Sequence, residues 1–118
     1  MSVEENKALI LHIWKESSSG NLKVMDEYFA DNFVRYAYDG TTMDKLAYKN
    51  FGAMVLKNIP DFHFSIDDMV AEGDKVAFRM TMTGTDHGKP FVEKETYFAR
   101  IEGGKVVEYV NLSRRINP

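Results

Sequence analysis

Residues 60–85, PDFHFSIDDMVAEGDKVAFRMTMTGT, decide the fold, because they contain two alternating segments separated by a turn signal, Gly73-Asp74. On either side of the turn, large apolar residues fill every second position: Phe62, Phe64 and Ile66 before it, and Val76, Phe78, Met80 and Met82 after it. A period of two is typical of a β-strand with one face in the core and the other in water. The stretch therefore predicts an antiparallel pair of strands.

Further strands are expected on both sides of this pair. Residues 91–101 and 105–113 are rich in aromatic and β-branched side chains, and Gly103-Gly104 between them suits a tight hairpin turn. Residues 32–38 have the same character and end at the turn signal Asp39-Gly40. Because a predicted helix separates residues 32–38 from the later strands, we expect this segment to pair at an edge of the sheet.

Three helices are predicted, two before the first strand and one after it. The first begins at a capping box formed by Ser2 and Glu5 and ends at Gly20. The second is expected over residues 21–31 and the third over residues 42–59, where a proline follows. This order of elements predicts an α+β fold, with N-terminal helices packed on a strongly curved antiparallel sheet.

The composition limits the classes of protein that need to be considered. A length of 118 residues with 44% hydrophobic residues is enough for one core, so a single domain over residues 1–118 is expected. The net charge of -3 is spread along the chain, and no basic stripe indicates binding to nucleic acid. There is no run of eighteen apolar residues for a membrane span and no signal-peptide pattern, so we expect a cytoplasmic protein.

The sequence indicates neither a metal site nor another cofactor. It contains no cysteine, which removes thiolate ligands and disulfides. The three histidines, His12, His63 and His87, follow no spacing that metal ligation needs. We therefore expect any chemistry to come from the side chains alone.

Three stretches resemble SnoaL-like domains of the nuclear-transport-factor-2-like superfamily. They are residues 6–33, NKALILHIWKESSSGNLKVMDEYFADNF, the stretch 60–85, and residues 99–110, ARIEGGKVVEYV, and their order and spacing match over nearly the whole chain. The resemblance implies the same α+β fold as a cone that holds a small apolar ligand, usually in a homodimer. It does not fix a function, because the superfamily contains polyketide cyclases, ketosteroid isomerases, dehydratases, epoxide hydrolases and domains without catalysis.

Four residues are expected to line the cavity: Trp14, Tyr36, Phe64 and Met80. The resemblance places Trp14 at an aromatic position that reaches the ligand in similar cyclases, and Tyr36 where many members carry a histidine. Phe64 and Met80 lie on the apolar faces of their predicted strands. The alternative for Trp14 is a large core side chain, and the alternative for Tyr36 is a tyrosine of the core or the rim.

Glu95, Tyr97 and Asn111 are the candidate catalytic residues. Glu95 and Tyr97 share one face of the strand 91–101, where the resemblance implies polar pocket residues. A carboxylate in an apolar cone has a raised pKa and suits the abstraction of a proton next to a carbonyl group, with Tyr36 or Tyr97 donating to the oxyanion. Asn111 lies near the position of a catalytic aspartate in the cyclases, but an amide cannot carry a proton.

An error of one residue in register would change this assignment. Such a shift would move Glu95 to the solvent face of the sheet, where Lys94 or Arg79 could pair with it. The same parity places Thr81 and Thr83 on the outer face with Arg79, and the resemblance implies that this face forms the seam of a homodimer.

The dipeptide Asp86-His87 has the composition of a proton-transfer pair. Gly88 and Pro90 follow it, and together the residues 86–90 have the chemistry of a hairpin turn between two strands. A turn explains each of these residues, so at most a role at the cavity rim is expected for Asp86.

The sequence leaves two kinds of function open. One is an enzyme of the cyclase, isomerase or dehydratase type that performs acid-base chemistry on a small apolar carbonyl compound. The other is a module that binds a ligand or forms a dimer without turnover. The two differ in the number of ionisable groups that converge on the cavity, and the sequence offers one carboxylate candidate, Glu95.

Overall fold

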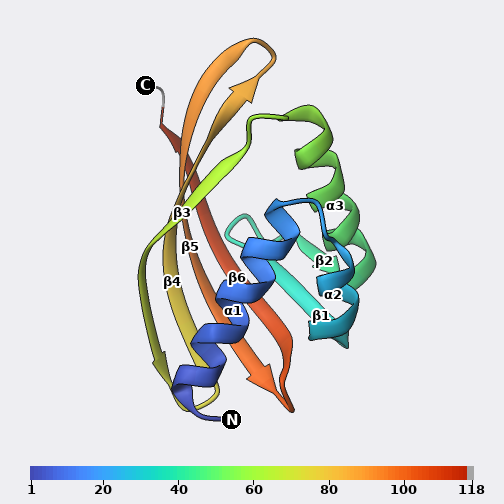
Figure 1. The fold of residues 1–118 in the computed structure, drawn as a ribbon, viewed down its shortest axis with the longest axis vertical. Helices are drawn as coiled ribbons and strands as arrows, with labels where there is room; N and C mark the ends of the chain where they lie inside the picture. Colours follow the sequence, from blue (N-terminus) through green and yellow to red (C-terminus); the bar gives the residue numbers. More distant parts are fainter. Residues whose placement is uncertain (117–118) are drawn as a thin grey trace.

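The computed structural model describes residues 1–116, which form three helices and a single six-stranded sheet (Figure 1). The elements follow in the order α1 (Val3–Ser18), α2 (Lys23–Tyr28), β1 (Phe29–Ala37), β2 (Thr42–Asp44), α3 (Lys45–Asn58), β3 (His63–Glu72), β4 (Lys75–Asp86), β5 (Lys89–Glu102) and β6 (Lys105–Ile116). None of the helices in this part of the chain is long and apolar enough to cross a membrane.

The sheet has the strand order β2-β1-β6-β5-β4-β3 and curves around α1, while α2 and α3 lie beside β1 (Figure 1). Strands β3 to β6 form an antiparallel meander, as residues 60–85 predict for its first two members. The predicted α+β fold with helices on a curved sheet is therefore confirmed. One pairing differs from a purely antiparallel sheet, because β1 runs parallel to β6.

The first helix is fixed at its start by the predicted capping box. The Ser2 Oγ accepts a hydrogen bond from the Glu5 amide at 3.1 Å, and the Glu5 carboxylate accepts one from the Ser2 amide at 3.1 Å. One turn further on, the buried Asn6 donates from Nδ2 to the Gly73 carbonyl at 3.3 Å. This contact joins α1 to the turn between β3 and β4 and so sets the position of the helix within the cone.

The second and third helices begin and end at other residues than predicted. Helix α2 ends at Tyr28, because Phe29 starts a strand and stacks on Phe33 in the core at a ring distance of 4.3 Å. Helix α3 is capped by Asp44, which accepts from the Ala47 amide at 2.8 Å, while residues 42–44 form the short edge strand β2. Core packing and a side-chain cap thus override the sequence pattern at these ends.

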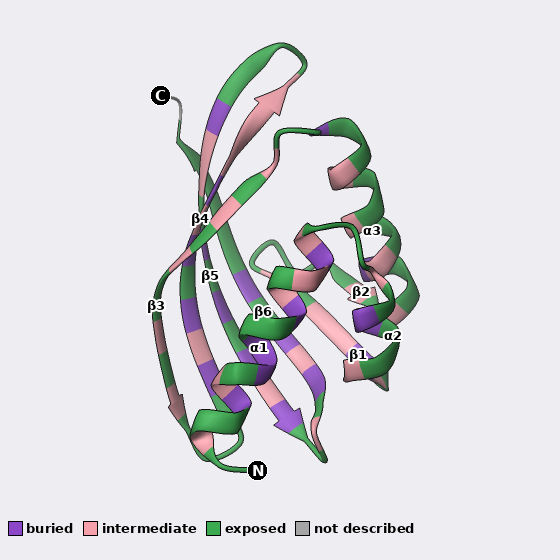
Figure 2. Cartoon of the chain, in the orientation of Figure 1, coloured by how far each residue is buried: buried purple, intermediate pink, exposed green. Residues whose placement is uncertain are grey.

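The core lies between the helices and the sheet, with members from all three helices and from β1, β4, β5 and β6. Buried residues alternate with more exposed ones along β4 and β5 (Figure 2). Tyr109 lies at the centre, in edge contact with Phe29, Phe33 and Tyr97, and Phe78 stacks on Tyr97 at 5.1 Å. Tyr48 and Met82 of this cluster also line the cavity described below.

Candidate functional site

A cavity of about 440 Å³ lies between α3, the end of α1 and strands β4 to β6. The helix side of the cavity is mostly apolar and includes Leu22, Met25, Phe51, Val55 and Ile59. The sheet side is polar and includes Glu93, Glu95, Asn111, Ser113 and Arg115. A cavity of this size, with one apolar and one polar wall, suits a small organic molecule that has an apolar body and a polar edge.

Glu95 is the buried carboxylate on the sheet side. Along β5 every second residue faces inward, which buries Glu95, Tyr97 and Ala99 and exposes the residues between them. The Glu95 side chain retains 9% of its exposure, and its strand neighbours are Met80 on β4 and Ser113 on β6. The strand alternation therefore carries a carboxylate into the cavity wall.

The surroundings of Glu95 disfavour its charged form. Burial raises the pKa of Glu95 from 4.5 to about 7. Hydrogen bonding to Tyr97 opposes this effect, the charge of Glu93 adds to it, and the charge of Arg35 and a hydrogen bond from Asn111 oppose it further. Because removal from water is the largest cause, Glu95 has the pKa of a group that can take up and release a proton near neutral pH.

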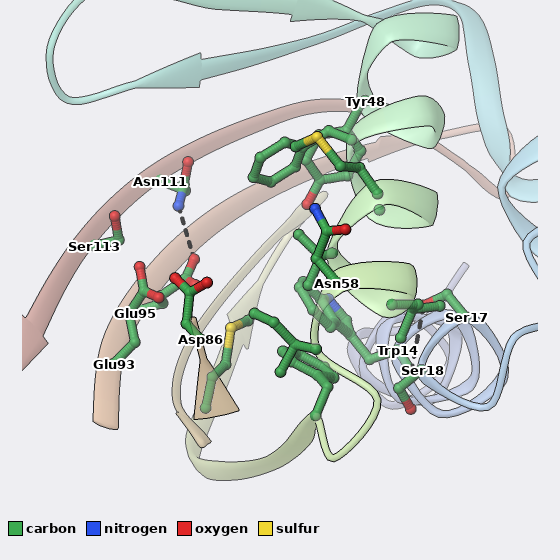
Figure 3. A pocket seen from close by; sticks show the side chains of 18 of the residues that line it. Trp14, Ser17, Ser18, Tyr48, Asn58, Asp86, Glu93, Glu95, Asn111 and Ser113 are labelled. Carbon is green, nitrogen blue, oxygen red and sulfur yellow. Dashed lines mark hydrogen bonds between the residues drawn. The ribbon is translucent and has the colours of Figure 1, made fainter. Parts of the chain in front are cut away.

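Asn111 joins Glu95 to a cation on another strand. Its Nδ2 donates to Glu95 Oε1 at 3.0 Å, a bond that Figure 3 shows as a dashed line. Its Oδ1 accepts from Arg35 Nη1 on β1 at 3.1 Å. A single amide thus bridges the carboxylate and the guanidinium, and the parallel pairing of β1 with β6, which places Arg35 near Asn111, makes this bridge possible.

Tyr97 supplies a phenol next to Glu95. It is buried between Phe78, on which it stacks, and Trp14, whose ring lies 5.2 Å away in edge geometry. Burial raises the pKa of Tyr97 well above its usual value, and the charges of Tyr48 and Glu95 raise it further. Tyr97 is therefore a neutral hydrogen-bond donor at physiological pH and not a base.

The family model for the SnoaL-like polyketide cyclases matches residues 8–114. The chain belongs to the SnoaL-like family. None of the curated proteins matches this SnoaL-like chain in sequence.

Several solved structures share the fold of this SnoaL-like protein. IdmH, a candidate polyketide cyclase from Streptomyces antibioticus, is 23% identical over 92% of this chain and 91% of its own, with a TM-score of 0.82. AclR, a candidate hydroxylase from Streptomyces galilaeus, is 24% identical over 96% and 81%, with a TM-score of 0.85. A protein with a ketosteroid isomerase-like fold from Catenulispora acidiphila is 18% identical over 87% and 82%, with a TM-score of 0.75.

The structure brings four of the seven candidate residues of the SnoaL-like protein to the cavity. These are Trp14, Glu95, Tyr97 and Asn111. The register of β5 places Glu95 inside the cone and not on the solvent face beside Lys94. Whether these residues act in catalysis stays a prediction.

The other three candidates do not line the cavity, which corrects the expectation. Tyr36 points away from the cone and is 42% exposed, because Phe33 takes the inward position and strand alternation then turns Tyr36 outward. Phe64 and Met80 do lie on inward faces, but they pack in the core below the cavity, Phe64 against Trp14 at 5.9 Å. Further along β4, Met82 reaches the cavity in place of Met80.

Asp86 ends β4 and His87 lies in the turn to β5, and both line the cavity. Asp86 accepts from Arg115 Nη1 at 2.9 Å, and this hydrogen bond lowers the pKa of Asp86. His87 Nδ1 lies 2.8 Å from the other Asp86 oxygen, but the imidazole is exposed and its residue has a positive φ of 51°. The geometry is that of a turn with a charged rim, as the sequence indicates.

Arg35 is one of several cavity residues that the sequence patterns do not reveal. It shares strand parity with Phe33, so the inward face of β1 could have been followed from the aromatic residue to the arginine. The partner that makes an inward arginine possible, Asn111, lies 76 positions away in the sequence. Because the sequence does not show this contact, nothing in it indicates that a charged side chain on β1 faces the cavity.

Proposed function

We propose that this protein binds a small, mostly apolar carbonyl compound and that Glu95 removes a proton from the carbon next to the carbonyl group. The observation that carries the proposal is a buried carboxylate with a pKa of about 7 in the wall of a cavity of about 440 Å³. A base is most effective when its pKa lies near the working pH. Membership of a family of cyclases is consistent with chemistry of this kind.

The proposed step needs no other reactant. The Glu95 carboxylate forms an O–H bond to the proton as the C–H bond breaks, and the C–H electron pair becomes the carbon–carbon double bond of an enolate. The carbonyl π electrons move to the oxygen, which takes the negative charge. In a cyclase, the enolate carbon forms a bond to the carbon of a second carbonyl group in the same molecule, whose π electrons move to its oxygen and take the proton from the Glu95 carboxylic acid. In an isomerase, the enolate instead regains that proton at another position.

The cavity surroundings support this role for Glu95. Asn111 contacts Oε1 of the carboxylate, and the side chain forms part of the cavity wall, where a ligand can reach it. The apolar side chains of α3 on the opposite wall, such as Phe51 and Val55, would cover the body of the ligand and exclude water.

Proton exchange on a model ketone tests the proposal. We would incubate the protein with 2-tetralone, an enolisable aromatic ketone, in deuterated buffer and follow the loss of its α-proton signals by NMR. Because Trp14 is the only tryptophan and lines the cavity, its fluorescence reports whether the ketone is bound. We expect exchange above the buffer rate in the wild type and a loss of about a hundredfold or more in Glu95→Gln.

The matched control is Glu93→Gln, which removes a carboxylate from the same strand and the same cavity wall. This variant should keep exchange activity within about tenfold of the wild type, because Glu93 is paired with Arg115 at 3.4 Å and the carboxylate of Glu95 is retained. Saturation of the Trp14 signal without exchange in the wild type would contradict catalysis by Glu95.

The second candidate function is a module that binds a ligand without turnover. It predicts binding of the ketone without proton exchange. The observation that favours it is Asn111, an amide that leaves Glu95 as the only buried carboxylate among residues 1–116. Enzymes that move protons between two carbons often use a second acid. In a binding module, Glu95→Gln would change the affinity for the ketone but not the rate of proton exchange.

We also propose that the protein forms a homodimer through the outer face of the sheet. Tyr36, Val110 and Phe98 lie side by side across β1, β6 and β5 on that face and are 42%, 41% and 46% exposed. A row of exposed apolar side chains across neighbouring strands is typical of a surface that another protein chain covers. On β3 and β4 the same face is polar, since Arg79 pairs with Asp68, so the proposed seam is centred on β5 and β6.

Sedimentation of two lysine variants tests the dimer. Phe98→Lys places a charge within the apolar row and should convert a particle of twice the chain mass into a monomer. Leu46→Lys, at an exposed position on α3, makes the same kind of change away from the row and should leave the mass unchanged. A wild-type protein that sediments as a monomer at tens of micromolar would contradict the proposal.

A further inference from the structure

Arg35 lies in the cavity wall, and the protein uses few of its hydrogen-bond donors. The residue is partly buried on β1 and contributes to the cavity wall. Its Nη1 donates to Asn111 Oδ1, but its Nε is buried and has no hydrogen-bond partner within residues 1–116. No carboxylate in this part of the chain forms an ion pair with its guanidinium, in contrast to Arg79, Arg100 and Arg115.

A guanidinium in this situation is suited to an anionic oxygen of a ligand. Arginine stays charged at all relevant pH values and has five N–H donors in one plane, of which the protein uses few here. A charge that is removed from water without a partner is costly, and a ligand oxygen that brings a negative charge would offset this cost. Arg35 therefore selects for a ligand oxygen that is charged or becomes charged.

Asn111 sets the spacing between this cation and the base. Its Oδ1, which Arg35 contacts, and its Nδ2, which contacts Glu95, are two bonds apart across one planar carbon. The oxygen and the α-carbon of an enolate are also two bonds apart across one planar carbon. A carbonyl compound lying along the Asn111 amide would therefore place its oxygen at Arg35 and its α-carbon at Glu95.

We propose that Arg35 is a catalytic residue that binds the oxygen on which negative charge develops when Glu95 removes the proton. This inference rests on the function proposed above. Arg35 takes the place of Tyr36 and Tyr97 as the donor to the oxyanion. Tyr36 lies outside the cavity, and Tyr97 is directed to Glu95. A donor that is charged and fixed before the reaction stabilises such an oxyanion more than a mobile one.

Binding of 4-nitrophenol tests the proposal without knowledge of the natural substrate. Its anion resembles an enolate and absorbs visible light, whereas its neutral form does not. At a pH below the pKa of the free phenol, Glu95 is mostly protonated and Arg35 should draw the bound phenol into its anionic form. 4-Nitrotoluene has nearly the same shape and no ionisable group, so it measures cavity binding alone through Trp14 fluorescence.

We expect Arg35→Gln to bind the 4-nitrophenol anion about ten- to a hundredfold more weakly and to lose the visible absorbance of the bound form. Its affinity for 4-nitrotoluene should change less than about threefold, which also shows that the cavity is intact. Arg79→Gln, on the outer face, makes the same change in net charge and should match the wild type in both assays. Arg35→Lys should keep part of the preference for the anion.

The assay separates this inference from the proposed function. Anion binding that depends on Arg35, together with proton exchange that depends on both Arg35 and Glu95, supports the two together. Neutral 4-nitrophenol bound to the wild type, or equal anion affinity in Arg35→Gln, would overturn the role of Arg35 and leave Glu95 as a base. Anion binding without any exchange of 2-tetralone would instead overturn catalysis and reduce Arg35 to a ligand-binding residue. If Arg35→Gln does not fold, the absorbance of the wild-type complex still decides whether the anion is bound.

Discussion

Replacing Glu95 by Gln should make the protein more stable at high pH, although it removes the proposed base. In the wild type the pKa of Glu95 is about 7 in the folded state and 4.5 when the group is in water. Between these values the folded state holds a proton that the unfolded state has lost, so the free energy of unfolding falls as pH rises. The full loss is about 3 kcal/mol, since a tenfold change in an equilibrium constant corresponds to about 1.4 kcal/mol. Glutamine has no charge to bury and avoids this loss.

The assay is urea or thermal unfolding of both proteins at a series of pH values, followed by circular dichroism. Below about pH 4 the two proteins should differ little, because Glu95 is protonated in both states and Asn111 Nδ2 can donate to the amide oxygen of the variant as it does to Glu95 Oε1. Above about pH 8 the variant should be more stable by about 3 kcal/mol, or roughly 10 °C in Tm for a chain of this length. Glu93→Gln serves as the control and should show only a small part of this rise, because Glu95 keeps its buried carboxylate and only the smaller effect of the Glu93 charge on its pKa is removed. A stability difference that is independent of pH, or that falls with pH, would refute the burial argument for Glu95.

Four further changes have defined outcomes. Glu93→Gln removes a negative charge that raises the pKa of Glu95, so the rising limb of a pH–exchange profile should move to lower pH. Asn111→Asp removes a hydrogen bond to Glu95 and adds a second carboxylate, so the same limb should move to higher pH. Gly84→Ala would place a methyl group against the side chain of Ile59. This overpacking should lower the free energy of unfolding by about 1–3 kcal/mol, measured by urea titration. Gly52→Ala, in the middle of α3 with room for a methyl group, should instead raise it by up to about 1 kcal/mol in the same titration.

The parts of the fold that depend on local patterns could be predicted from the sequence. The alternation in residues 60–85 and the hairpin at Gly103-Gly104 correspond to β3 to β6, and the capping box of Ser2 starts α1. Each depends on residues a few positions apart, so periodicity and turn chemistry are sufficient. The parallel pairing of β1 with β6 could not be read in this way, because nothing within residues 29–37 determines the direction of a partner near the other end of the chain.

In the candidate site too, positions set by a local pattern could be predicted, and positions set by a contact between distant strands could not. The parity of β5 placed Glu95 and Tyr97 on the inward face, because one strand is enough to define it. Arg35 was missed because a charged side chain is expected to face water unless a partner is known. Its partner is Asn111 on β6, which only the completed sheet brings near. Residues whose burial depends on a contact between distant strands are the ones that sequence patterns assign to the wrong face.

The pairing of β1 with β6 also has a consequence for the order of events during synthesis. Arg35 leaves the ribosome 76 residues before Asn111, and until β6 has emerged the strand β1 has only the three-residue β2 as a neighbour. Contacts between such distant segments form slowly and leave an unpaired strand edge exposed in the meantime. The nascent chain therefore carries an open β1 edge through most of translation, and the Arg35–Asn111–Glu95 bridge can close only when the last strand docks.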